Sequence, residues 1–387
     1  MRQETFTLSQ KELQRVSVIS ACIKGDMACA RAAGLLGLSV RQIKRLKKRM
    51  REDGEAALAH ANRGRPSHRR LADAVREKIV QLSRYTYAGF NDHHLCEKLV
   101  EREGFALSRE TLRRLLRQHG LGSPRKRRAP AHRQRRVRSA RLGELVQLDG
   151  SPHDWLQGRG PRLTALGMQD DATGKILAAQ FFLSEGTLGY LCLLRQLLRR
   201  HGVPLAFYGD RSGVFVRNDE HWTVAEQLAG KRQPTQFGRA LQQLGVNFIA
   251  ANSPQAKGRV ERLWGVLQDR LTSELRLAQA NDMVSANAVL RKFIADYNRR
   301  FGRRPRQTAT AWRVAPPHLE RICCLVHERI VSHDNIVQWE GRRFQIPQHP
   351  QRFSFAGAKV QIYQALNGHL TFYYGDTRLQ HSAFSGG

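Results

Sequence analysis

Three acidic residues occur where a catalytic carboxylate is expected. Asp149 lies at the end of the short apolar segment 144–150, and Asp210 ends a second such segment, 204–210. Both segments have the composition of buried strands, and catalytic side chains collect at strand ends in an α/β sheet. The third acid, Glu261, lies on a predicted helix. Because Mg²⁺ prefers carboxylate oxygens together with water, two aspartates and a glutamate suffice to hold divalent ions.

The helix that carries Glu261 has a clear start and a clear apolar face. Ser253 is a suitable N-cap, and Pro254 a suitable first helical residue. Lys257, Glu261 and Gln268 share one flank of the apolar stripe. A carboxylate at such a border is as often an ordinary solvated residue, so the two aspartates decide the interpretation. The stripe consists of Val260, Leu263, Trp264, Leu267 and Leu271.

The segments between the acids predict the elements that position them. Residues 163–182 form two strands around a turn at 170–174, and 187–200 form an amphipathic helix. Asp170 and Asp171 are interpreted as turn formers and are left out of the site. A further strand covers 246–250, and segment 211–237 is interpreted as an insertion near the site, in contact with DNA or a partner subunit.

The order of these elements carries a family resemblance. Asp149, Asp210 and Glu261 are spaced 61 and 51 residues apart, in a strand, a strand and a helix. This resembles the ribonuclease-H-like catalytic core of the DDE transposases and retroviral-type integrases. The most specific piece is Ala-Lys-Gly-Arg-Val-Glu-Arg at 256–262. With its flanking domains, the chain is similar to bacterial insertion-sequence transposases, and the ISNCY group is the expected subgroup.

The resemblance implies a reaction and its cofactor. Such enzymes bind the terminal inverted repeats of a mobile element, cleave at its ends and join the 3′ ends to target DNA. Two Mg²⁺ about 4 Å apart serve both the attacking and the leaving oxygen, and Mn²⁺ substitutes for them. Asp149 would bridge the two ions, while Asp210 and Glu261 would each complete one site. Lys257 would hold a DNA phosphate, although a solvated lysine explains it equally well.

The overall charge favours a polyanionic partner. The chain has 387 residues, with 65 Lys and Arg against 33 Asp and Glu, which gives a formal charge of +32. Such a balance favours a polyanion, and the resemblance implies that this polyanion is double-stranded DNA. The longest apolar runs are too short to span a membrane, so a cytoplasmic, nucleoid-associated protein is expected. The six scattered cysteines are expected to be reduced thiols. By analogy, the protein acts as a homo-oligomer on DNA.

Residues 1–60 are predicted to form a helix-turn-helix domain. Helical patterns at 9–23, 28–36 and 40–52 surround a Gly-Leu-Ser turn at 37–39. The last helix is basic and would lie in the major groove, with a solvated basic face as the alternative. Its predicted DNA contacts are Arg41, Gln42, Lys44, Arg45 and Lys48.

A second DNA-binding region follows a short linker. Linker 61–70 contains Arg63 and Arg65 in an Arg-Gly-Arg-Pro sequence that resembles minor-groove arms, although a plain flexible linker fits as well. Residues 71–122 are predicted to form a second helix-turn-helix domain, and the basic linker 123–141 is predicted to follow DNA phosphates. The predicted contacts are Arg109, Arg113, Arg114, Arg117, Arg125, Lys126, Arg127 and Arg128.

The predicted fold class is therefore multidomain. All-α helix-turn-helix domains precede an α/β ribonuclease-H-like core at 142–305. At 322–378 the hydrophobic period changes to two, which predicts short strands, and the resemblance implies that they form a small β-barrel. The barrel would hold DNA or contact another subunit.

Two other functions remain compatible with this sequence. A non-catalytic DNA-binding regulator derived from a transposase would have a broken triad, whereas the three acids here are intact. A ribonuclease or junction nuclease would fit the acids but would not need two helix-turn-helix domains.

Overall fold

The structure is a computed structural model that describes residues 8–59, 70–122, 129, 137–219, 221–251, 258–350 and 352–384. The chain divides into two compact units, Met1–Arg76 and Glu77–Gly387. All six cysteines lie in the described part and are free thiols, as expected. None of the described helices has the length and apolar character needed to cross a membrane.

The first unit contains a bundle of helices in the predicted order. Ser9 caps the first helix and Ser39 the third, each in a capping box that satisfies two otherwise unpaired backbone N–H groups. Gly37 has φ of 60°, so the turn between the second and third helices uses the left-handed region that glycine tolerates. Ile19 and Ile43 are fully buried between the helices. The elements are α1 (Gln10–Lys24), α2 (Cys29–Leu36), α3 (Val40–Asp53) and the 3₁₀ turn η1 (Glu55–Leu58).

Three more helices form a second bundle. They are α4 (Asp73–Arg84), α5 (Asp92–Glu103) and α6 (Arg109–Gln118). Asn91 caps α5 and Ser108 caps α6, through side-chain oxygens that accept backbone N–H groups. Tyr87 is buried in this bundle and donates to Glu103 Oε1 at 2.8 Å. Burial, with the neighbouring Glu103, raises the pKa of Tyr87 to about 12.

The centre of the second compact unit is a mixed five-stranded sheet with the order β3-β2-β1-β4-β5. β1 pairs antiparallel with β2, and β2 with β3, whereas β4 and β5 run parallel to β1. The parallel pairs require crossovers, which the intervening helices provide. The strands are β1 (Leu145–His153), β2 (Leu163–Asp170), β3 (Ile176–Phe182), β4 (Ala206–Gly209) and β5 (Asn247–Ala250).

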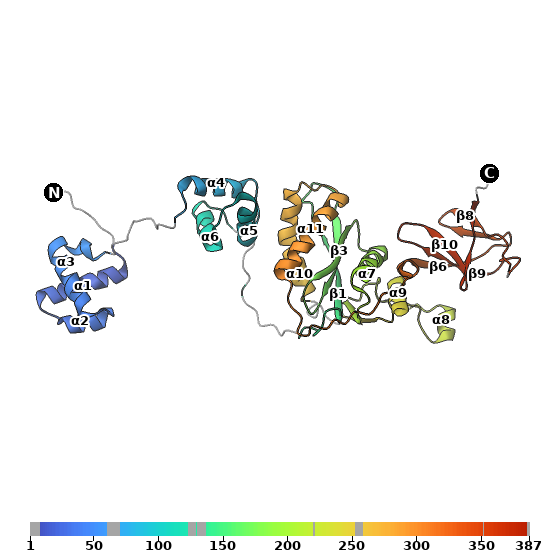
Figure 1. Ribbon diagram of the computed structural model, residues 1–387, viewed down its shortest axis with the longest axis horizontal. Helices are drawn as coiled ribbons and strands as arrows, with labels where there is room; N and C mark the ends of the chain where they lie inside the picture. Colours follow the sequence, from blue (N-terminus) through green and yellow to red (C-terminus); the bar gives the residue numbers. More distant parts are fainter. Residues whose placement is uncertain are drawn as a thin grey trace. The chain divides into compact units, whose positions relative to one another are not determined.

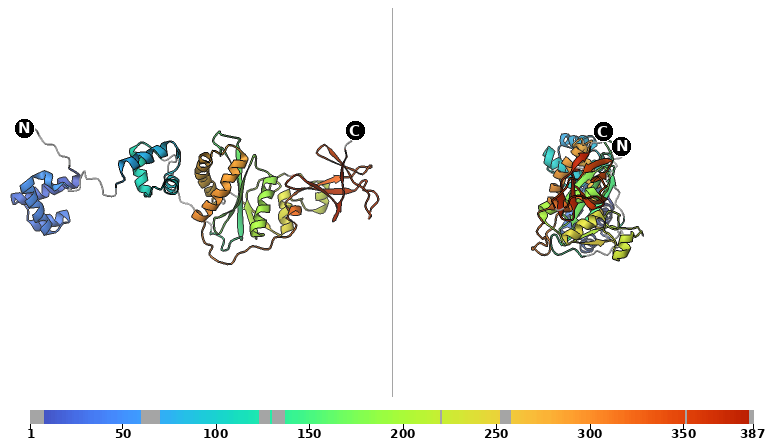
Figure 2. Two further views of the ribbon diagram at one scale, coloured as in Figure 1. Left: turned by 45° about the horizontal axis from the view of Figure 1, so that its top comes forward. Right: turned by 90° about the vertical axis from the view of Figure 1, so that its right-hand side faces the viewer.

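Helices cover both faces of this sheet (Figure 1). α7 (Thr187–His201) and α9 (Gln236–Leu244) bury Val146, Leu148 and Leu166 on one face. On the other face, α10 (Val260–Leu277) and α11 (Met283–Phe301) bury Leu163, Ala165 and Phe181. The same three layers are visible from the second direction in Figure 2. The sequence therefore yields a mixed α/β core, as expected.

The carboxy-terminal strands form two sheets that share one apolar core. The four-stranded sheet has the order β11-β10-β9-β6 and the three-stranded sheet the order β12-β8-β7. Within the described residues, the strands do not close into a barrel, so the expected barrel is not confirmed. The elements after the short helix α12 (Leu319–Ile322) are β6 (Leu325–Ile330), β7 (Ile336–Trp339), β8 (Arg342–Gln345), β9 (Lys359–Gln364), β10 (Leu370–Tyr374), β11 (Thr377–Leu379) and β12 (Ser382–Phe384).

Three details differ from the sequence prediction. β1 continues beyond Asp149 to His153, because its later residues stay paired with β2. α10 begins at Val260 after a turn, while Ser253 and Pro254 lie outside the described residues. The predicted insertion contains the short helix α8 (Val224–Ala229) and leads directly into α9, which the prediction did not include.

Candidate active site

The sheet brings Asp149 and Asp210 to the same level. In the parallel β1–β4 pair, Val146 is opposite Phe207 and Gln147 is opposite Tyr208. Two residues further along, this register puts Asp149 opposite Asp210, which directly follows the last residue of β4. Neighbouring strands lie about 5 Å apart, so the two carboxylates, distant in sequence, become neighbours.

Both aspartates project toward the layer of α10. Side chains alternate along a strand, and Val146, Leu148 and Phe207 face the opposite layer of α7 and α9. Asp149 is held on the α10 side because Trp264 Nε1 donates to its Oδ2 at 3.0 Å. The backbone N–H of Ser212 donates to Asp210 Oδ1 at 2.9 Å. One oxygen of each aspartate is thus fixed by an N–H donor.

Two glycines make this arrangement possible. Gly167 is opposite Asp149 on β2, and a Cβ there would lie 3.0 Å from the indole of Trp264. A Cβ on Gly209, which precedes Asp210, would lie 3.0 Å from both Leu148 and Phe248. The indole can therefore lie over the sheet and reach Asp149, and β4 can approach β1 closely.

Glu261 lies in the first turn of α10, on the layer that the aspartates face. Trp264, three residues later, contacts Asp149, and Gln268 Nε2 contacts Ser151 Oγ at 3.2 Å, so α10 follows β1. The Glu261 side chain is exposed. Across the described residues, no three His, Cys, Asp or Glu side chains lie close enough to hold a metal ion. The structure aligns the two aspartates and brings the glutamate to their face, without closing the three into one cluster.

Asp170 and Asp171 have the structural role that the sequence indicated. Asp170 is fully buried and accepts hydrogen bonds from Thr173 N and Oγ1, at 2.7 and 2.6 Å, and from Gly143 N at 3.0 Å. Asp171, 1% exposed, contacts Arg259 and accepts from Gln147 Nε2 at 2.5 Å. These carboxylates hold the turn and the start of α10 in place.

A buried tyrosine and a fourth acid lie beside the aspartates, and sequence analysis missed both. Tyr190 on α7 is fully buried, and its hydroxyl donates to Glu185 Oε1 at 2.6 Å. Burial raises the pKa of Tyr190 far above its ordinary value, and the negative charges of Glu185, Asp149 and Asp210 add to the shift. Glu185 also lies against Gly150, since a Cβ at Gly150 would be 2.5 Å from its Oε2. No motif in the sequence marks Glu185, because this contact joins segments that are remote in the chain.

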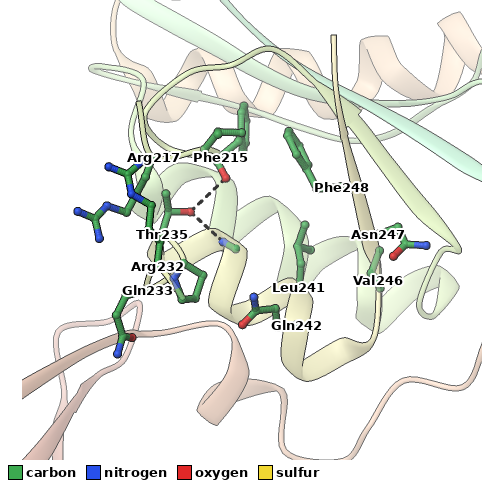
Figure 3. Close-up of a pocket in the computed structure, with 13 residues that line it drawn as sticks. Phe215, Arg217, Arg232, Gln233, Thr235, Leu241, Gln242, Val246, Asn247 and Phe248 are labelled. Carbon is green, nitrogen blue, oxygen red and sulfur yellow. Dashed lines mark hydrogen bonds between the residues drawn. The ribbon is translucent and has the colours of Figure 1, made fainter. Parts of the chain in front are cut away.

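A pocket of about 400 Å³ lies in the segment that follows Asp210 (Figure 3). Phe215 and Phe248 stack in it with ring centroids 5.2 Å apart. Thr235 Oγ1 accepts from Gly238 N at 3.0 Å and donates to Phe215 O at 3.4 Å. These two hydrogen bonds hold one wall of the pocket in place. Arg217 is held by Glu226, a buried acid, and by Asp219 at 2.8 Å. The described part of the predicted insertion thus contributes Phe215, Arg217 and Thr235 to the lining of this pocket.

Comparisons with known proteins decide the family. A family model described as a helix-turn-helix domain matches residues 14–67. The chain is 39% identical over 369 residues to a putative transposase, y4bF, of Sinorhizobium fredii. This match covers 94% of this chain and 79% of that protein. The chain is also 31% identical over 396 residues to the transposase for insertion sequence IS1202 of Streptococcus pneumoniae. This match covers 93% of this chain and 83% of that protein. The chain belongs to the family of insertion-sequence transposases.

Solved structures with partial likeness come from viral integration complexes. A simian T-cell lymphotropic virus intasome bound to PP2A regulatory subunit B56 gamma has a TM-score of 0.31 at 14% identity, covering 78% of this transposase and 97% of that chain. The catalytic core domain of HTLV-2 integrase in complex with magnesium has a TM-score of 0.28 at 14% identity, with coverages of 40% and 86%. Both TM-scores are low, so we describe the fold of the transposase core from its own sheet alone. The ISNCY subgroup is not confirmed.

The predicted DNA contacts of the transposase fall into three groups. On α3, Arg41, Lys44, Arg45 and Lys48 are exposed, whereas Gln42 Oε1 accepts from Ser39 N at 3.0 Å within the helix cap. The α6 arginines contact side chains of their own bundle. The remaining contacts lie outside the described residues: Arg63, Arg65, Arg125, Lys126, Arg127, Arg128 and Lys257. All of them stay predictions.

The second bundle of the transposase is docked on α10 by charged groups. Glu274 Oε1 on α10 lies 2.6 Å from His94 Nε2 and 2.7 Å from Lys98 Nζ. Arg270 Nη1 lies 2.7 Å from Glu97 Oε2. These residues of α10 follow Glu261 by two to four helical turns, so one helix carries both the candidate catalytic acid and the docking surface.

Proposed function

We propose that the chain is a DDE transposase that binds double-stranded DNA at terminal inverted repeats, cleaves at the element ends and joins the 3′ ends to target DNA. This proposal rests on the alignment of Asp149 with Asp210, on the sheet face that α10 covers. Glu261, in the first turn of α10, is the third acid and would complete the set when DNA is bound. This arrangement supports a polynucleotidyl transferase of the ribonuclease-H-like type.

The side chains fit a divalent metal. Asp149 and Asp210 are both partly exposed, and each has an oxygen oriented by an N–H group, which reduces the entropy lost when a ligand atom is fixed. Hard carboxylate oxygens on one face suit Mg²⁺, and Mn²⁺ would substitute. When bound, two such ions would supply Lewis-acid chemistry to the phosphodiester. Trp264 would hold Asp149 in position while Glu261 approaches.

The test is strand transfer by the full chain with a labelled terminal repeat and Mg²⁺. Asp149→Asn, Asp210→Asn and Glu261→Gln should each abolish cleavage and transfer while leaving DNA binding intact, because each removes one ligand charge without changing the shape. Asp154→Asn is the matched control, since Asp154 is an exposed acid near the end of β1, and it should stay active.

Two results would contradict the proposal. Transfer that survives any of the three substitutions would reject the assignment of that residue. Binding without cleavage by the native chain would favour a non-catalytic DNA-binding regulator instead. Cross-linking on paired DNA ends would show whether two or more chains assemble, as the proposed reaction on two ends requires.

A further inference from the structure

The turn between β2 and β3 gathers arginines from three distant parts of the chain. Arg138 Nη1 donates to Asp171 O at 2.8 Å, and Arg259 contacts the Asp171 carboxylate. The backbone N–H of Arg303 donates to Thr173 O at 2.9 Å. Arg306 Nη2 donates to Arg138 O at 2.9 Å. With Arg262, one turn after Arg259 on α10, these residues form what we call the turn arginine cluster: Arg138, Arg259, Arg262, Arg303 and Arg306.

The acids of this turn do not balance the five arginines. Asp170 and Asp171 are both buried, and each is committed to hydrogen bonds with several neighbours. Arg138 and Arg306 donate to main-chain carbonyls, which carry no formal charge. Even when Glu261, between Arg259 and Arg262, is counted with the two aspartates, five guanidinium groups outnumber three carboxylates and leave an excess of positive charge in this region.

The neighbouring positive charges affect the pKa of Arg138. Burial lowers the pKa of Arg138, and repulsion from Arg259, Arg303 and Arg262 lowers it further, while Asp171 opposes the shift. A bound anion would relieve this repulsion. Arg262, Arg303 and Arg306 are exposed, so an anion can reach the cluster from solvent.

The cluster is linked to the candidate active site through β1 and α10. Gln147 donates to Asp171 and lies two residues before Asp149 on the same face of β1. Arg259 and Arg262 flank Glu261 at the start of α10. An anion held beside Arg259 and Arg262 would therefore lie at the start of α10, where Glu261 is.

We propose that the turn arginine cluster binds backbone phosphates of the DNA strand that enters the active site. The inference rests on the proposed function and adds the residues that position the DNA beside the three acids. Arginine suits this role because its planar guanidinium can donate two hydrogen bonds to one phosphate. Such binding is independent of base sequence, so it would serve element ends and target DNA alike.

The experiment measures binding of a fluorescent blunt-ended DNA duplex by the full chain, in EDTA, over a series of salt concentrations. Arg303→Gln and Arg138→Gln should each weaken binding and reduce the slope of log affinity against log salt, by about 0.9 for each phosphate that is no longer neutralised. Arg200→Gln is the matched control, because Arg200 is an exposed arginine on α7, which covers the opposite face of the sheet. It should leave the slope near the native value.

A second measurement does not use DNA. Inorganic phosphate should raise the unfolding temperature of the native chain above that in chloride of equal ionic strength, and Arg303→Gln should reduce the gain more than Arg200→Gln does. Folded variants whose slope and phosphate gain both equal those of Arg200→Gln would overturn the inference. Because neither measurement requires cleavage, a native chain that shows these effects without cutting DNA would reject the proposed reaction and retain the phosphate site.

Discussion

The third helix of each amino-terminal bundle is basic, but the arginines of these two helices have different surroundings. On α3, Arg41 and Arg45 are exposed, and Lys48 lies 3.6 Å from Glu52 in an exposed pair. On α6, Arg113 and Arg114 both contact Glu110, at 2.8 and 3.0 Å. Arg117 Nη2 lies 2.6 Å from Asp92 Oδ2 at the start of α5. The second bundle therefore uses part of its basic charge to hold itself together.

The difference extends to what each bundle touches. The first bundle matches a helix-turn-helix model and lies in its own compact unit. The second belongs to the same compact unit as the core, and its helix α5, with the Asn91 cap, brings Asn91, His94, Glu97 and Lys98 against α10. Similar sequence patterns thus produce one bundle that matches a helix-turn-helix model and another that packs on α10.

The largest expected effect comes from breaking the docking of the second bundle. Arg270 is 9% exposed, is paired with Glu97, and its guanidinium carbon lies 5.1 Å from the ring centroid of Phe301. Arg270→Met should lower the unfolding free energy of the second unit by about 3 kcal/mol, because the Glu97 carboxylate loses a positively charged partner. Denaturant unfolding measures this change.

The control in the first bundle is Lys48→Met, which breaks an exposed pair and should cost about 0.5 kcal/mol or less. Adding Glu97→Gln to Arg270→Met should cost less than the sum of the two single changes. Equal losses from Lys48→Met and Arg270→Met would remove the contrast between the bundles.

The second prediction compares DNA binding by α3 and α6. Arg41→Gln combined with Arg45→Gln should weaken binding to a terminal repeat by about 2 kcal/mol, as expected when hydrogen bonds to base edges are removed. Arg117→Gln should change binding less and mainly lower stability, since Arg117 is paired with Asp92. Titration of each variant with labelled DNA, alongside thermal unfolding, separates the two effects. A larger binding loss from Arg117→Gln would assign the DNA-reading role to the second bundle.

The third and smallest effect is a dependence on pH at the docking surface. Burial alone would raise the pKa of Glu274, but hydrogen bonds and charges from His94 and Lys98 lower it from 4.5 to about 2. A lowered carboxylate pKa stabilises the native state above the unfolded value, and this stability is lost as the pH falls toward the folded value. The stability difference between the native chain and Glu274→Gln should therefore shrink between about pH 4.5 and pH 2.

Chemical unfolding at several pH values measures this difference. Glu52→Gln in α3 is the matched control, because the Glu52 carboxylate is exposed, and it should leave the unfolding of the second unit unchanged. A difference for Glu274→Gln that stays constant over the interval would contradict the assigned ion pairs.

The sequence predicted most elements, because local signals define them. The predicted helical segments 9–23 and 40–52 are helices in the structure, and Ser9 and Ser39 cap them by accepting backbone N–H groups. The helix α9 was missed, although Phe237, Ala240, Leu241 and Leu244 have helical spacing and are buried. Its pattern lay at the edge of a polar segment that was interpreted as an insertion.

The site was predicted only as far as residue type and spacing allow. The strand ending at Asp149 was drawn too short, because Gly150 and Pro152 suggest a break, whereas pairing with β2 carries the strand on. Contacts such as Trp264 with Asp149, 115 residues apart, leave no trace in local sequence. The same holds for the pairing of Arg117 with Asp92, which determines whether an arginine is available to DNA.

The double use of α10 has a mechanical consequence. Its 18 residues form a rod about 27 Å long, with Glu261 near one end and Glu274 near the other. A rod that pivots at its docked end by roughly five degrees would displace its far end by about 2 Å. Reacting groups that are displaced by about 1 Å can lose roughly a hundredfold in reaction rate. The contacts that hold the second bundle on α10 therefore also bear on where Glu261, the proposed third acid, lies relative to the two aspartates.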